Sequence, residues 1–170
     1  MEPVPFFRHV QHKAIVALYA VDYEDEPDQD IYSPFQYLIC FEHSPVFLDL
    51  EDAADGEHLR VTWRATTGLE SYLHELVEKG LWKPYPVAVH EPLGALLGKC
   101  FSRARYATAK EPAERIATWL PGCPHVYKGV RLEGEAHALT VFNNGVGLFA
   151  GLDTDVQPPF EKTYDWTAFD

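Results

Sequence analysis

The stretch AIVALYAV, residues 14–21, decides the fold, because it is short, continuously apolar and rich in β-forming residues. A second such stretch, FQYLICF, covers residues 35–41, and a third, VFLDL, covers residues 46–50. The fourth, HLRVTWR at residues 58–64, alternates apolar and polar side chains with the period of two that is typical of a half-buried strand. Four short strands joined by turns predict an antiparallel β-meander.

The middle of the chain predicts two or three helices. Thr67 and Glu70 form a capping-box pattern ahead of an apolar stripe with helical spacing. A proline begins a second helical pattern over residues 92–105, in which we expect Gly94 to let a neighbouring element approach closely. A third, short helix is expected over residues 112–120, and the Pro-Gly pair at residues 121–122 is expected to end it.

The C-terminal third returns to β-structure. A strand is expected over residues 125–132, and residues 138–150 predict a hairpin around Asn144-Gly145, a pair that adopts the positive φ angles of a two-residue turn. One further short strand is expected earlier, over residues 87–89, between the first two helices. The aromatic residues of the tail, 153–170, are expected to pack on the surface of the domain. The whole chain, 1–170, is therefore predicted to be a single α+β domain with a meander, helices and a C-terminal β-hairpin that joins or flanks the sheet.

The composition excludes several classes of protein. Apolar residues make up 46% of the 170 residues, which is too many for a disordered chain. The longest purely apolar run has eight residues, far fewer than the roughly 18 that a membrane span needs. The first residues lack the pattern of a signal peptide, and three widely spaced cysteines indicate reduced thiols. We therefore expect a cytoplasmic protein that binds neither membrane nor nucleic acid, since its net charge of -12 repels phosphates.

The negative charge is concentrated in one continuous part of the chain. Residues 14–59 contain twelve acids and no lysine or arginine, whereas the remaining sequence contains 14 acids and 14 bases. Crowded like charges destabilise a folded protein, so this asymmetry needs a reason. It is either a device for solubility or a surface that attracts a basic partner.

Two acidic connections carry this charge, one over residues 22–34 and one over residues 51–57. The first is long for a loop without regular structure, which favours a binding role. Two tyrosines flank it and would supply aromatic anchors, where the binding energy of interfaces concentrates. The predicted partner-binding residues are Asp22, Tyr23, Glu24, Asp25, Glu26, Asp28, Asp30, Tyr32, Glu51, Asp52, Asp55 and Glu57.

We expect no metal, cofactor or catalytic residue. An EF-hand loop beginning at Asp22 would need glycine at its sixth position and glutamate at its twelfth, and the chain has Pro27 and Ser33 there. The pairs at 40/43 and 123/125, each one cysteine and one histidine, provide four possible zinc ligands without the close repeat of spacing that zinc sites have. No G-x-S-x-G nucleophile motif is present.

The sequence thus predicts an acidic protein-binding module, an inhibitor or immunity-type protein of a bacterial cytoplasm that masks the basic surface of a partner protein. Two other classes stay open. One is a small hydrolase with a histidine/carboxylate site, and the other is a structural or assembly subunit. We expect the basic residues Lys99, Arg103 and Arg105, with Lys110 and Arg115 nearby, on one face of the second helix. This face is either a solvated surface or a site that binds the acidic part of another copy in a homodimer.

Overall fold

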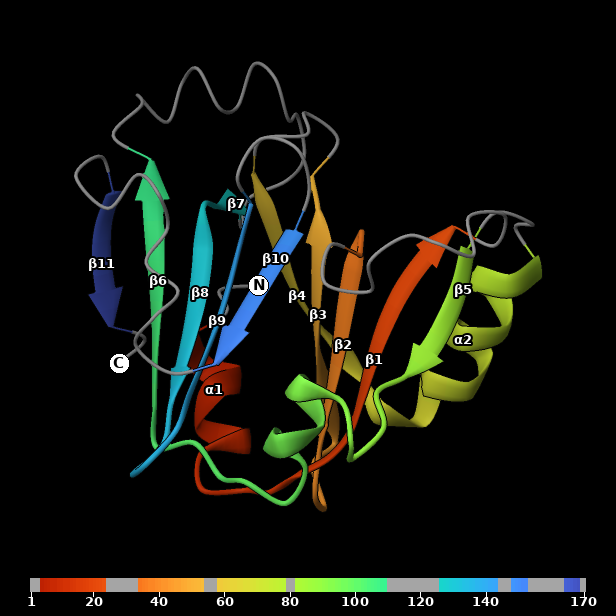
Figure 1. Cartoon of the computed structure of the whole chain (residues 1–170), viewed down its shortest axis with the longest axis horizontal. Helices are drawn as coiled ribbons and strands as arrows, with labels where there is room; N and C mark the ends of the chain where they lie inside the picture. Colours follow the sequence, from red (N-terminus) through yellow and green to blue (C-terminus); the bar gives the residue numbers. More distant parts are fainter. Residues whose placement is uncertain are drawn as a thin grey trace.

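Four strands of the first sheet follow one another along the chain as a meander. A computed structural model of the chain describes residues 4–23, 34–53, 58–78, 82–109, 126–143, 148–152 and 164–168. The strands of the meander are β1 (Ile15–Tyr23), β2 (Gln36–Phe41), β3 (Val46–Asp52) and β4 (Leu59–Ala65). Each pairs antiparallel with the next, as predicted (Figure 1).

Two more strands complete this sheet. β5 (Trp82–Pro86) pairs with β1, and the short β7 (Val126–Tyr127) pairs with β4, so the order is β5-β1-β2-β3-β4-β7. The strand expected over residues 87–89 was therefore placed too late in the chain. Val87 continues the ladder by one hydrogen bond from its N–H to the carbonyl oxygen of Leu18.

The second sheet contains the rest of the C-terminal β-structure. Its strands, in spatial order, are β10 (Leu148–Leu152), β9 (Ala138–Asn143), β8 (Gly129–Glu133), β6 (Arg103–Ala109) and β11 (Tyr164–Ala168). All of their pairings are antiparallel. The predicted hairpin is confirmed as β9 and β10, but Asn143 pairs with Leu148, so four residues separate the strands and the predicted two-residue turn is wrong. The strand expected over residues 125–132 appears as β7 and β8, one in each sheet, with Lys128 between them.

The hydrophobic core lies between the two sheets. Leu18, Ile39 and Leu48 of the first sheet belong to the same buried cluster as Leu132 and Val141 of the second. The alternation of β4 is also confirmed, since Leu59 and Val61 point into this cluster. A helix that the sequence did not predict, α1 (Val4–Val10), adds Phe7 and Val10 to it. The α+β class is therefore correct.

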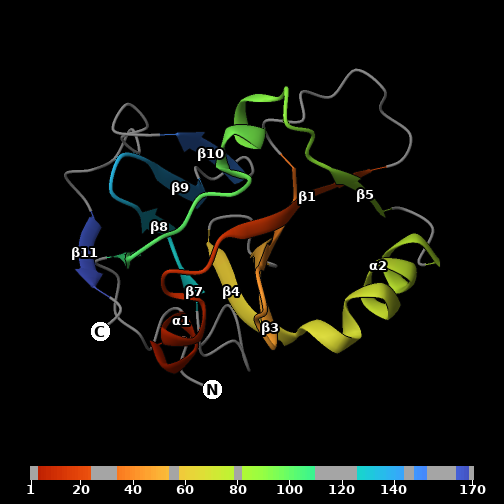
Figure 2. The same ribbon diagram turned by 90° about the horizontal axis from the view of Figure 1, so that it is seen from below.

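The opposite face of the first sheet is covered by helix α2 (Leu69–Glu78), as Figure 2 shows. A 3-10 turn, η1 (Thr66–Gly68), precedes the helix, so the regular helix begins two residues after the predicted cap at Thr67. Leu76 packs with Leu38 and Phe47 in a second buried cluster. Among the described helices, none combines the length and the apolar character that crossing a bilayer requires.

The helix predicted over residues 92–105 is wrong. The chain forms only the short 3-10 helix η2 (Pro92–Leu96), and the later part of the pattern is strand β6. Gly98 has a φ of 81°, which breaks any helix at that point, and Leu97 is already extended. The apolar spacing was misleading because a turn followed by a strand also buries most of that pattern, although Cys100 is exposed. The short helix expected over residues 112–120 lies outside the described residues.

The close approach predicted at Gly94 is confirmed. A Cβ atom built on Gly94 would lie 1.9 Å from the carbonyl oxygen of Ala88. Backbone cannot give way as the end of a flexible side chain can, so any larger residue would push η2 away from residues 87–89. This contact determines where η2 sits beside β5.

Candidate functional site

The two acidic connections begin and end at neighbouring positions on the first sheet. The N–H of Phe35 donates to the carbonyl oxygen of Val21 at 3.1 Å, and the N–H of Asp52 donates to the carbonyl oxygen of Phe35 at 2.8 Å. The N–H of Ala53 donates to the carbonyl oxygen of His58 at 2.9 Å. These bonds join the end of β1, the start of β2, the end of β3 and the start of β4 at one end of the sheet.

We call residues 24–33 and 54–57 the acidic segments. They contain seven acids and no lysine or arginine. The chain enters and leaves both segments at the neighbouring strand ends just described. The predicted site residues that lie in these segments are outside the described residues: Glu24, Asp25, Glu26, Asp28, Asp30, Tyr32, Asp55 and Glu57.

The other four predicted site residues belong to strand ends. Asp22 and Tyr23 close β1, and Glu51 and Asp52 close β3. Asp22 is buried, with 6% of its surface exposed. Burial and the nearby Asp22 carboxylate both raise the pKa of the Tyr37 hydroxyl. Asp22 is therefore part of the interior at the base of the first acidic segment.

Glu51 and Asp52 both have partners within the chain. Glu51 forms an ion pair with Arg60 on the neighbouring strand, and both side chains are about one-third exposed. Asp52 accepts a hydrogen bond of 2.6 Å from the side-chain amide of Asn143, which also donates to the carbonyl oxygen of His58 at 3.0 Å. Asn143 thus ties the second sheet to this end of the first. The carboxylates of Glu51 and Asp52 are therefore already engaged within the chain.

A buried polar cluster on the outer face of the first sheet was not predicted. The side chain of Asp49 is completely buried and forms an ion pair with Arg64. The amide of Gln36 donates to Asp49 at 2.6 Å and to the hydroxyl of Tyr72 at 2.7 Å, and that hydroxyl donates to Asp49 at 3.3 Å. An acid inside the apolar stretch at residues 46–50 was the one signal of this cluster in the sequence.

This cluster attaches α2 to the sheet. The guanidinium of Arg64 lies 4.3 Å from the centre of the Tyr72 ring, a cation–π contact between strand and helix. Burial raises the pKa of the Asp49 carboxyl, against the hydrogen bonds from Gln36 and Arg64, and burial raises the pKa of Tyr72 to about 12. Because Asp49 is inaccessible, the cluster is suited to positioning the helix and not to contacting a ligand.

The outer face of the second sheet carries positive charge. Arg105 and Arg131 form ion pairs with Glu133, and Arg103 lies 4.0 Å from the same carboxylate. Although burial raises the pKa of Glu133, hydrogen bonds from Arg131 and Arg105 lower it below the ordinary value of 4.5. The basic face expected on a helix is thus on strand β6, where alternation places Arg103 and Arg105 on the same side.

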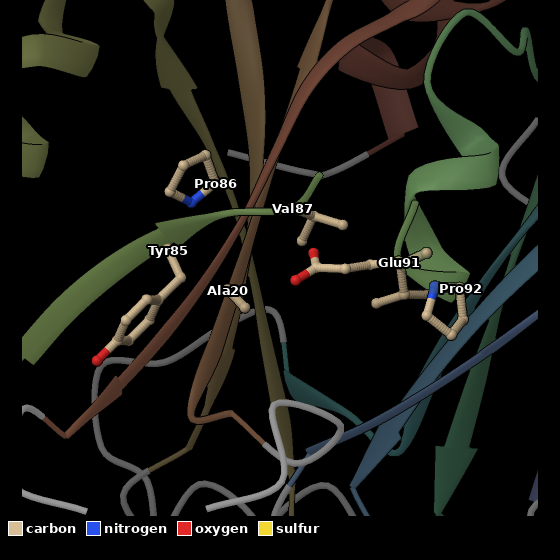
Figure 3. Close-up of a pocket in the computed structure, with 7 residues that line it drawn as sticks. Ala20, Tyr85, Pro86, Val87, Glu91 and Pro92 are labelled. Carbon is tan, nitrogen blue, oxygen red and sulfur yellow. The ribbon is translucent and has the colours of Figure 1, made fainter. Parts of the chain in front are cut away.

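An apolar cavity of about 140 Å³ lies beside β1, β5 and η2. Figure 3 shows its lining, in which Glu91 supplies the one carboxylate among the described residues. The lining consists of Ala20, Tyr85, Pro86, Val87, Glu91, Pro92 and Leu93.

The two possible zinc ligands that the structure describes, Cys40 and His43, differ in burial. Cys40 is buried against the α2 side of the sheet, whereas the His43 side chain is 90% exposed. Cys123 and His125 lie outside the described residues. Within the ranges that the structure describes, no three His, Cys, Asp or Glu side chains gather closely enough to hold a metal ion.

Comparisons of the chain with protein-family models, with curated proteins and with solved structures give no match. The function is therefore inferred from the residues and their arrangement alone.

Proposed function

We propose that this chain is a protein-binding module whose acidic segments engage a basic partner protein and mask a cationic surface on it. The observation that carries the proposal is the adjacency of the strand ends from which both segments start. A chain of hydrogen bonds from Val21 through Phe35 to Asp52 brings them together, although they are about 30 residues apart in sequence. Acidic residues that serve solubility alone can lie anywhere on the surface, so they need not be in two segments that start from neighbouring strand ends.

The charge on the neighbouring strands supports the same function. Glu51 is paired with Arg60, and Asp52 is bonded to Asn143. Since these two described acids are already paired, we assign the electrostatic contact to the seven acids of the segments. Such a concentration of one sign raises association rates with an oppositely charged partner by about 10- to 1,000-fold at low salt.

The alternative of a hydrolase has less support among the described residues. The described lining of the apolar cavity contains Glu91 and no histidine, cysteine or serine. A second pocket, on the second sheet, is lined by Ser102, Glu133 and His137 among others. There Glu133 is ion-paired with Arg105 and Arg131, and Nε2 of His137 is hydrogen-bonded to the carbonyl oxygen of Cys100 at 2.8 Å, so these groups are already engaged and do not form the acid–base pair that hydrolysis requires. The remaining alternative is an assembly subunit that contacts its partner through the tail. It depends on the side chains of residues 153–170, which the structure does not describe.

Two variants with equal charge change test the proposal. The segment variant carries Glu24→Gln, Glu26→Gln, Asp28→Asn and Asp30→Asn. The control variant removes four exposed acids elsewhere, with Glu42→Gln, Glu70→Gln, Glu78→Gln and Glu135→Gln. Both variants lose the same charge, so a difference between them reports the position of the charge.

Each protein is immobilised and exposed to an extract of the source cell, and the retained proteins are identified by mass spectrometry. We expect the wild type and the control variant to retain a basic protein that the segment variant loses. The association rate of that protein with the segment variant should be lower by about tenfold or more at low salt. Equal loss in both variants would mean that only net charge matters, and the proposal would be wrong.

A further inference from the structure

The apolar cavity lies where η2 closes the open side between the two sheets. Figure 2 shows η2 between β1 of the first sheet and β10 of the second, and η2 packs against β10. Its volume of about 140 Å³ is close to that of an engineered protein cavity, about 150 Å³, that holds a benzene molecule. A chain of four or five carbon atoms is therefore of suitable size to fill it.

The carboxylate of Glu91 is held in place at the cavity. Its Oε2 accepts a hydrogen bond of 2.8 Å from the N–H of Ala88, and the N–H of Glu91 donates to the carbonyl oxygen of Ala88 at 3.0 Å. Close packing at Gly94 keeps this turn against η2. Figure 3 shows the carboxylate directed toward Ala20 and Val87, across the apolar lining.

More polar groups lie on the same face of the sheet beside the cavity. Ala20 lines the cavity, and Asp22 follows it two residues later on the same side of β1. Tyr37 pairs with Ala20 across the ladder. Its hydroxyl is buried and, within the described residues, makes no hydrogen bond. The surroundings of the cavity therefore combine an apolar lining with two carboxyl groups and a buried hydroxyl that, within the described residues, makes no hydrogen bond.

Such surroundings favour a cation on an apolar stem. A partly buried carboxylate is costly unless a positive group compensates it, and an apolar lining rewards the burial of methylene groups. Arginine binds carboxylates best with two parallel hydrogen bonds, one to each oxygen, and the N–H of Ala88 already takes one of the two lone pairs of Oε2. Lysine suits the site better, since its compact ammonium group needs one oxygen and its stem has four carbons.

We propose that this cavity receives a lysine side chain of the basic partner. The assignment rests on the proposed function, because it gives the cationic partner a specific anchor beside its electrostatic surface. Ala20 lies three residues before the end of β1, where the first acidic segment begins. A lysine that the segments attract would therefore find the cavity close to their base. Anchors of this kind, buried in a pocket within an otherwise polar contact, carry much of the binding energy of interfaces.

The test uses small probes, with binding followed through the backbone amide signals of residues 20, 85 and 87 in NMR spectra. The probes are n-butylammonium chloride, n-butanol, the peptide acetyl-Gly-Lys-Gly-amide and the same peptide with norleucine in place of lysine. The variant is Glu91→Gln, whose side-chain oxygen can still accept from Ala88. The matched control is Glu135→Gln, an exposed acid in the turn between β8 and β9. Unchanged unfolding temperatures verify that both variants fold.

We expect the lysine peptide and butylammonium to shift these signals and the norleucine peptide to bind at least about tenfold more weakly. Glu91→Gln should weaken the two cationic probes by about tenfold or more and leave butanol unchanged, whereas Glu135→Gln should change nothing. Equal binding of the lysine and norleucine peptides, or an unaffected Glu91→Gln, would overturn the assignment. Binding of butylammonium without the lysine peptide would also overturn it, in favour of a free amine.

A failure of this assignment can be distinguished from a failure of the proposed function. If the cavity does not bind the lysine probes, the expected difference in association rate between the segment and control variants is unaffected. Conversely, if that difference is missing, the proposed function fails even though the cavity binds lysine.

Discussion

The N–H of Asp52 donates a hydrogen bond of 2.8 Å to the carbonyl oxygen of Phe35, and this bond places the bases of the two acidic segments side by side. One segment ends just before Pro34 and the other starts just after Ala53. Seven carboxylates are thereby attached at one end of a six-stranded sheet, with no lysine or arginine among them. Repulsion among like charges makes this arrangement unfavourable for folding.

The segment variant should therefore be more stable than the wild type. Neutralising four of the carboxylates relieves repulsion, and we expect the unfolding temperature at low salt to rise by about 2–4 °C. The rise should shrink at about 0.3 M salt, where screening already weakens the repulsion. Differential scanning calorimetry measures both values. A control variant that gains as much would show that the repulsion is spread over the whole molecule.

Much of the fold was predictable because periodicity is a local property of the sequence. The alternation in β4 and the apolar runs of β1 to β3 determine a meander without any knowledge of distant residues. The pairing of β9 with β10 is equally local, although the connection is two residues longer than the turn predicted at Asn144-Gly145. The sequence did not reveal that β6 and β8 pair into a separate sheet, since that depends on contacts between residues far apart in the chain.

The polar groups at the sites were less predictable. Asp49 sits in an apolar run, and its partners Gln36, Arg64 and Tyr72 come from three other elements. Glu91 lies in a turn whose importance comes from the fit of Gly94 against Ala88. The spacing of residues along the chain cannot predict such contacts, because they depend on how distant elements pack together.

Removing Asp49 should destabilise the protein strongly. In Asp49→Ala, the guanidinium of Arg64 and the amide of Gln36 lose their acceptor, and we expect a loss of about 2–4 kcal/mol in the free energy of unfolding. Asp49→Asn keeps an acceptor oxygen and should cost clearly less. Urea unfolding followed by tryptophan fluorescence measures both.

The pair Glu51–Arg60 on the same face provides the control. Both side chains are about one-third exposed, so Glu51→Gln should cost no more than about 1 kcal/mol. A similar cost for Asp49→Ala and Glu51→Gln would show that the buried cluster does not hold α2.

Gly94→Ala should destabilise the protein by about 1–3 kcal/mol, because the new methyl group would overlap the carbonyl oxygen of Ala88. Gly68→Ala is the matched substitution, since a Cβ there has no neighbour within 4 Å. It should leave stability unchanged or raise it by up to about 1 kcal/mol. Thermal unfolding of both variants makes the comparison, and equal effects would contradict the close packing of η2.

Acid should weaken the arginine cluster on the second sheet. Arg131 and Arg105 hold the pKa of Glu133 below its ordinary value of 4.5, so its contribution to stability is complete above that value. The contribution is lost as the pH falls from about 4.5 through the lower pKa of the folded state. Between neutral pH and about pH 3, the wild type should lose more stability than Glu133→Gln. Parallel stability curves for the two proteins would exclude this role for Glu133.

The most direct test of the account is the salt dependence of association with the captured basic protein. Stopped-flow rates are measured for the wild type, the segment variant and the control variant between about 0.02 M and 0.5 M salt, a range over which screening of surface charges becomes nearly complete. We predict a steep fall in rate for the wild type and the control variant, and a shallow one for the segment variant that meets the others at high salt. Three curves of the same slope would show that the acidic segments do not guide the partner.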